Sequence, residues 1–82
     1  MTPPEVRDAL RSWIRAHNPE VPEGEPADDT PIIERRYLTS LQVADLLVFI
    51  EELRQAPLDP SGLRPGTFRT IDAIHDAFFL GS

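Results

Sequence analysis

The 82-residue chain contains no cysteine, and none of its apolar stretches is long. Without cysteine it can form neither a disulfide nor a thiolate metal site, which suits a reducing cytosol. A membrane-spanning helix needs about 20 consecutive apolar residues, and no run in the sequence approaches that length. The first residues also lack the basic and then apolar order of a secretion signal. We therefore expect a soluble cytoplasmic protein.

Positive charge is scarce as well. Eight Lys and Arg stand against 14 Asp and Glu, which gives a formal net charge of −6 at pH 7. Nucleic acid and anionic lipid would repel such a chain, whereas basic protein surfaces would attract it. The length suits one small domain, near the lower limit for a core that folds unaided. We expect a single domain over residues 1–82 that binds neither nucleic acid nor membrane.

Residues that would form a catalytic or metal site are sparse. His17 and His75 have no second ligand three or four residues away, so no metal site is expected. A hydrolase triad of Ser40, His75 and an aspartate is conceivable. However, no glycine elbow surrounds Ser40, and the chain is too short to build a substrate pocket. The sequence therefore predicts a protein that is not an enzyme.

The first helix is expected over residues 3–17. Thr2-Pro3-Pro4-Glu5 supplies a threonine cap, proline in the first turn and a glutamate three residues after the cap. Asn18-Pro19 ends the helix, because a residue before proline is pushed out of the helical region. Residues 18–38 are expected to form a long acidic loop, whose proline-rich and acidic part over residues 18–30 is extended and partly mobile. The apolar residues near its end should pin it to the helices: Ile32, Ile33, Tyr37 and Leu38.

The second helix is the longest apolar-periodic stretch and is expected over residues 40–55. Thr39 and Gln42 form a capping box, which places Ser40 in the first turn beside the positive end of the helix dipole. One side carries a stripe for the core: Val43, Leu46, Leu47, Ile50 and Leu53. The opposite side mixes apolar and acidic residues: Leu41, Asp45, Val48 and Glu52. We call these four the outer stripe and expect it to contact a partner, because it has no core to fill.

Two further helical segments complete the predicted fold. A short third helix is expected over residues 60–63, started by Asp59-Pro60. A last helix is expected over residues 68–79, capped by Thr67 or Thr70. The fold class is all-α: a small four-helix bundle with a long loop between helices I and II and a short helix III.

Trp13 is expected to be buried in the core of this bundle. It lies near Val6, Leu10 and Ile14 on the apolar side of the first helix. The residues expected opposite them come from the second and last helices: Leu46, Ile50, Ile74 and Phe78.

The start of the second helix resembles that of the acyl and peptidyl carrier proteins. Their motif is Asp-Ser-Leu, in which the serine carries 4′-phosphopantetheine. Here the motif is Thr39-Ser40-Leu41, followed by the apolar helix with its Glu51-Glu52-Leu53 end. The resemblance continues through Pro57-Leu58-Asp59-Pro60 to Phe68-Arg69-Thr70-Ile71-Asp72-Ala73-Ile74, and upstream it includes the first helix and the loop. Thr39 stands where the family has aspartate, which bears on how readily a transferase would accept Ser40.

The resemblance implies a monomeric acyl carrier protein with 4′-phosphopantetheine, taken from coenzyme A, on Ser40. The implied cargo is an aminoacyl or short acyl thioester, as in small free-standing carriers of bacterial natural-product pathways. A polyketide or fatty-acid carrier is the close alternative. The implied partners are a phosphopantetheinyl transferase, an adenylating ligase or acyltransferase, and a downstream transferase, ketosynthase or condensing enzyme. The expected partner-docking residues are Leu41, Asp45, Val48, Glu51 and Glu52.

A function of another class stays open: an unmodified helical adaptor that binds a partner through the outer stripe. Thr39 in place of aspartate favours it. Serine in the first turn of a helix also often serves only as a cap, although Thr39 is better placed for that role. Arg35 and Arg36 would approach a phosphate on Ser40, or, on the plainer interpretation, neutralise nearby acidic residues.

Overall fold

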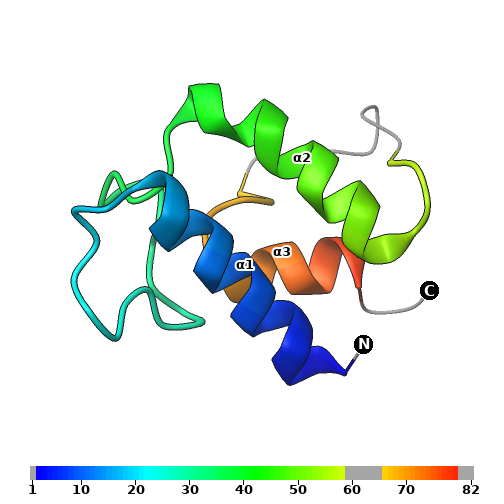
Figure 1. The fold of residues 1–82 in the computed structure, drawn as a ribbon, viewed down its shortest axis with the longest axis horizontal. Helices are drawn as coiled ribbons and strands as arrows, with labels where there is room; N and C mark the ends of the chain where they lie inside the picture. Colours follow the sequence, from blue (N-terminus) through cyan, green and yellow to red (C-terminus); the bar gives the residue numbers. More distant parts are fainter. Residues whose placement is uncertain (1, 59–65, 80–82) are drawn as a thin grey trace.

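The computed structural model describes residues 2–58 and 66–79, and this part of the chain is all-helical without any strand. Its helices are α1 (Pro3–His17), α2 (Ser40–Arg54) and α3 (Ile71–Phe78). In Figure 1, α2 lies above α1 and α3, and the long loop is at the end of the bundle where α1 ends and α2 begins. The all-α class is confirmed. The expected short helix over residues 60–63 lies outside the described residues, so the predicted count of four helices is not confirmed.

The helix starts follow the local sequence. The Thr2 side chain accepts a hydrogen bond from the Glu5 N–H, and the Glu5 carboxylate accepts one in return from the Thr2 N–H, as a capping box requires. α1 then has the predicted bounds. The last helix was predicted from residue 68, with Thr67 or Thr70 as its cap; Thr70 is the cap, and it accepts from the Ala73 N–H at 2.9 Å. α3 therefore begins three residues later than predicted, after a turn that contains Phe68.

The end of α2 also differs slightly from the prediction. Gln55 has φ 56°, in the left-handed region, and its N–H donates to the Glu51 carbonyl. The helix therefore ends at Arg54, one residue before the predicted end.

The core lies where the three helices and the end of the loop meet. Its buried members are Val6, Leu10, Ile14, Ile32, Leu38, Leu46, Ile50, Ile71 and Ile74. Trp13 was predicted among them but lies half-buried at the rim. Leu10 and Ile14 occupy the centre, and the Trp13 ring turns toward α2, stacked on His17 and Phe49 at centroid distances of 3.8 and 6.1 Å.

The loop between α1 and α2 is held by hydrogen bonds from α1. Three arginines spaced four residues apart reach toward it: Arg7, Arg11 and Arg15. The Arg11 Nε donates to the Pro26 carbonyl at 2.6 Å, and the Arg15 Nη1 donates to the Pro22 carbonyl at 2.7 Å. Pro26 is fully buried. Backbone carbonyls that a solvated loop would offer to water are satisfied here by guanidinium groups.

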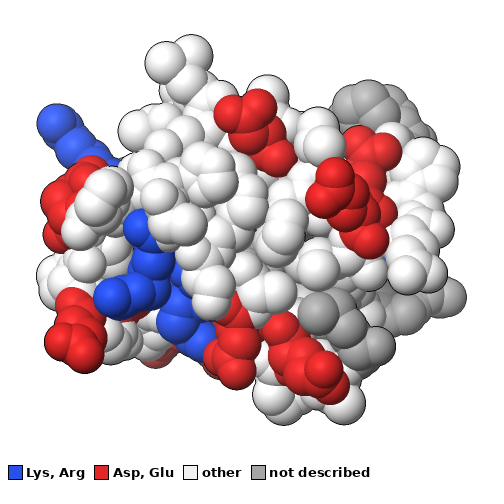
Figure 2. All heavy atoms as spheres, viewed as in Figure 1, with Lys and Arg blue, Asp and Glu red and all other residues white. Residues whose placement is uncertain are grey.

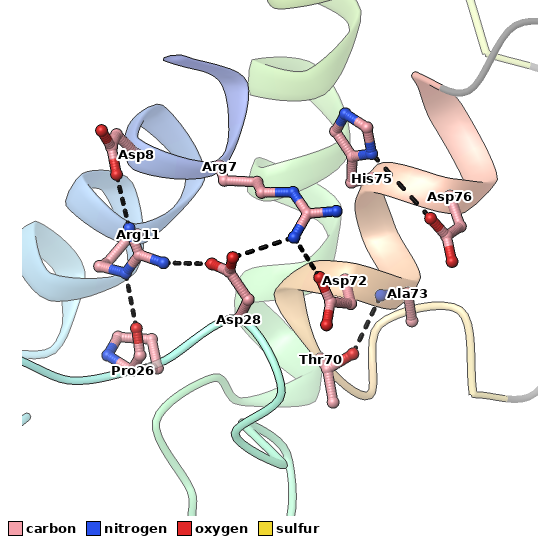
Figure 3. Close-up of polar contacts among 10 residues, drawn as sticks. All are labelled: Arg7, Asp8, Arg11, Pro26, Asp28, Thr70, Asp72, Ala73, His75 and Asp76. Atoms are coloured by element: carbon pink, nitrogen blue, oxygen red, sulfur yellow. Dashed lines mark hydrogen bonds and ion pairs between the residues drawn. The ribbon is translucent and has the colours of Figure 1, made fainter. Parts of the chain in front are cut away.

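Asp28 joins this loop to two helices (Figure 3). Its carboxylate accepts hydrogen bonds from Arg7 and Arg11, and the Arg7 Nη1–Asp28 Oδ2 distance is 2.9 Å. Arg7 also contacts the carboxylate of Asp72 in α3. The Asp28 carbonyl accepts from the Asp72 N–H at 2.9 Å. One residue of the loop thus contacts both α1 and α3.

The end of the loop returns to the core through Ile32 and Leu38, which are 0% and 1% exposed. The prediction that apolar residues pin this segment is therefore confirmed for these two. It is wrong for Ile33, which is 40% exposed, while Tyr37 is half-buried. The Ile32 N–H donates to the Arg69 carbonyl at 2.9 Å. This bond places the end of the loop beside the turn that precedes α3.

Replacing Asp28 by alanine should lower the free energy of unfolding by about 1–2 kcal/mol, since Arg7 and Arg11 would lose a shared, partly buried acceptor. The neighbouring Asp29 is exposed, and Asp29→Ala should change the value by less than about 0.5 kcal/mol. Urea unfolding of both variants at low and at 1 M salt measures the difference. Equal losses for the two variants would show that Asp28 does not hold the loop.

Candidate functional site

Ser40 is the first residue of α2 and is exposed to solvent. Thr39 is the N-cap: its Oγ1 accepts from the Gln42 N–H at 3.3 Å, and its own N–H donates to the Gln42 Oε1 at 3.2 Å. The predicted capping box is therefore confirmed. Because Thr39 performs the capping, the Ser40 hydroxyl is available to a reagent that approaches the helix start.

The first turn of α2 carries no acidic residue. No carboxylate within the first turn therefore neutralises the positive end of the helix dipole. The first acidic residue along the helix is Asp45, more than one turn beyond Ser40. Backbone N–H groups and the dipole at such a position favour an anion covalently held there, such as a phosphodiester.

A groove of about 510 Å³ opens beside Ser40. It is lined by α2, by the end of the loop and by the turn before α3: Ile33, Glu34, Ser40, Val43, Gly66, Thr67, Phe68 and Arg69. Apolar side chains alternate with polar ones, and Arg69 Nε lies 3.7 Å from the Glu34 Oε1 in an exposed ion pair. A groove of this size and mixed lining suits a small, flexible, partly polar organic group.

The outer stripe of α2 is exposed, as predicted. Leu41 is 88% exposed and Val48 is 55% exposed, so two large apolar side chains of one helix face solvent. Asp45 and Glu52 are exposed between and beyond them. Figure 2 shows acidic side chains separated by uncharged surface over the part of the molecule that α2 occupies.

Glu51 lies closer to the body of the domain than the outer stripe and is half-buried. Together with Val48 and Glu52 it lines an open hollow of about 430 Å³ near the end of α2. The five residues predicted to dock a partner therefore share one helix, but Glu51 offers less surface than the other four.

The two histidines do not join Ser40. His75 is 3% exposed and lines a hollow together with Leu53 and Arg54, at the opposite end of α2 from Ser40. At 1.5 Å per residue the two ends of this helix are about 20 Å apart, so the conceivable triad is not formed. His17 is exposed, and its Nδ1 lies 2.9 Å from the Trp13 carbonyl. Within residues 2–58 and 66–79, no group of three or more His, Cys, Asp or Glu is arranged to hold a metal ion.

Two features of the site were missed in the sequence. The turn containing Phe68 was predicted to be helical, and nothing local indicated that it would face Ser40 across a groove. Gln42 was recognised only as part of a capping box, yet its Nε2 also donates to the His17 carbonyl at 3.3 Å. Both features depend on contacts between residues at least 25 positions apart, which periodicity does not report.

Comparison with known proteins gives no match to a family model, to a curated protein or to a solved structure. Among the described residues, no helix combines the length and the apolar character needed to cross a membrane.

Thr39→Ala should lower the free energy of unfolding by about 1 kcal/mol, because it removes the side-chain oxygen that caps α2. Thr39→Asp, which keeps a capping oxygen, should stay within about 0.5 kcal/mol of the parent. Thermal unfolding followed by circular dichroism gives both values. A Thr39→Ala variant as stable as the parent would mean that the cap contributes nothing to α2.

Proposed function

We propose that this chain is a carrier protein that holds an aminoacyl or short acyl group as a thioester on 4′-phosphopantetheine attached to Ser40. The observation that supports it most is the exposed Ser40 at the first residue of α2, relieved of capping by Thr39 and bordering a groove. The resemblance of Thr39-Ser40-Leu41 and the following helix to the carrier motif supports it independently.

The residues around Ser40 fit a phosphopantetheine group. The exposed hydroxyl accepts the phosphoryl unit, the start of α2, whose first turn has no acidic residue, favours its negative charge, and the groove offers apolar contacts from Val43 and Phe68. When bound, phosphopantetheine would supply a thiol at the end of a flexible arm, where the cargo is held as a thioester. Tethering raises the effective concentration of the cargo at each partner without requiring strong binding.

Attachment requires coenzyme A and a phosphopantetheinyl transferase. The Ser40 oxygen attacks the phosphorus nearest to pantetheine, and a phosphodiester bond to Ser40 forms. The bond from that phosphorus to the oxygen of the nucleotide half breaks, and adenosine 3′,5′-bisphosphate leaves. The Ser40 proton passes to a base on the transferase. In this proposal the chain contributes the hydroxyl and its placement, and it is a substrate of the transferase and not an enzyme.

The outer stripe would dock the partner enzymes: the transferase, the ligase or acyltransferase that loads the cargo, and the enzyme that receives it. Burial of Val48 against a partner would contribute about 1–2 kcal/mol. Asp45 and Glu52 would mainly speed the encounter with a basic surface, an effect that salt screens. Weak contacts of this kind allow the rapid release that a carrier needs between successive partners.

Two alternatives use the same residues differently. A polyketide or fatty-acid carrier would have the same Ser40 chemistry with another cargo, and the apolar residues of the groove, Ile33, Val43 and Phe68, suit a short acyl chain. An unmodified adaptor would use the outer stripe alone, and the exposure of Leu41 and Val48 favours it equally. Modification of Ser40 separates the adaptor from both carriers.

Treatment with coenzyme A and a transferase of broad specificity should add one phosphopantetheine mass to the parent chain and none to Ser40→Ala. Ser12→Ala serves as the matched control, because Ser12 is exposed on α1 and should not affect labelling. Intact-mass spectrometry measures all three proteins. An unlabelled parent favours the adaptor, and a labelled Ser40→Ala variant would place the modification at another residue.

Val48→Asp should reduce loading of the modified protein by its cognate enzyme about tenfold, while the melting temperature stays near that of the parent, since Val48 is 55% exposed. Glu23→Gln in the exposed part of the loop is the control and should have much less effect. A thioester-loading assay at two salt concentrations compares them. Greater damage from the loop variant would mean that partners dock on the loop.

A further inference from the structure

The side chain of Gln42 satisfies backbone groups at two different helix ends. Its Oε1 accepts from the Thr39 N–H at 3.2 Å, at the start of α2. Its Nε2 donates to the His17 carbonyl at 3.3 Å, at the end of α1. Both are groups that a helix leaves without a partner within itself. One amide therefore links the turn that carries Ser40 to the neighbouring helix.

An amide can make both bonds, because it carries an acceptor oxygen and a donor nitrogen. A glutamate would complete the capping box and would interact better with the positive end of the helix dipole. Its ionised carboxylate, however, accepts hydrogen bonds but cannot donate one to the His17 carbonyl. Gln42 thus gives up a favourable charge at this position and gains a contact with α1.

This contact bears on the groove beside Ser40. Ser40 and Val43 form its α2 side, while Phe68 and Arg69 form the side that precedes α3. A shift of the α2 start relative to α1 therefore moves Ser40 relative to the opposite wall. An enzyme that docks across the groove must bring a reacting phosphorus to the Ser40 oxygen, and a misplacement of about 1 Å is enough to slow such a reaction strongly.

We propose that Gln42 is a positioning residue, whose bond to the His17 carbonyl fixes the start of α2 and holds Ser40 in place for phosphopantetheine transfer. The proposal rests on the carrier function proposed above. Gln42 acts through the placement of Ser40 and does not itself touch the reacting atoms.

Gln42→Glu isolates this bond, because it keeps the acceptor for the Thr39 N–H and loses the donor to the His17 carbonyl. We expect kcat for transfer from coenzyme A to fall about three- to tenfold, as for the loss of one hydrogen bond. KM for the carrier should stay within about twofold, because the outer stripe is untouched. The melting temperature should remain close to that of the parent.

Ala44→Glu is the control for the added negative charge, since Ala44 is exposed on the same part of α2 and lies outside the contact. Its kcat should match that of the parent. A second readout follows the position of α2 directly. The chain has no cysteine, so spin labels at Ala16→Cys and Asp45→Cys report only the distance between α1 and α2. Gln42→Glu should broaden that distance distribution.

The outcomes are distinct. A lower kcat for Gln42→Glu together with a broader distance distribution supports the proposal. A kcat equal to that of Ala44→Glu, or an unchanged distance distribution, overturns it and leaves Gln42 as a helix cap only. If the parent itself takes no phosphopantetheine, the carrier function fails first, and the positioning role in that reaction fails with it.

Discussion

The structure depends on one constraint: the long loop between His17 and Ser40 must be fastened to the helices. It contains no helix, and the apolar side chains that it buries stand several positions apart: Val21, Pro26, Ile32 and Leu38. Asp28 provides one main part of this attachment, because its carboxylate binds two arginines of α1 and its carbonyl accepts the Asp72 N–H of α3. A chain with net charge −6 thus places part of its positive charge where it orders the loop.

The groove beside Ser40 is formed partly by the end of this loop. With the loop held, Ile32 reaches the core and bonds to the turn before α3, so that this turn and the end of the loop border Ser40 together. On the far side, Gln42 joins the start of α2 to α1. Ser40 is the first residue of α2, and the groove beside it is lined by three separate stretches of chain: α2, the end of the loop and the turn before α3.

The sequence was informative where the determining interactions are local. Thr2 and Thr39 predicted two helix starts correctly, because a capping box involves residues only three positions apart. The exposure of Leu41 and Val48 followed from helical spacing in the same way. The groove, the fastening of the loop and the rim position of Trp13 depend on distant residues, and no spacing rule reports these. The acidic composition of the loop gave no sign of its partners on α1, because Arg7 and Arg11 lie 21 and 17 positions from Asp28 in the chain.

The contact between Arg7 and Asp72 also has a consequence for the order of folding. These residues lie 65 positions apart in the chain, and Arg7 and Asp28 lie 21 apart. Contacts that close such long segments are costly in chain entropy, whereas the capped helices require only neighbouring residues. The ion pairs of the loop are thus expected to form after the helices have packed together. These ion pairs would then slow unfolding without accelerating folding, so they would govern how long the folded domain persists and not how quickly it forms.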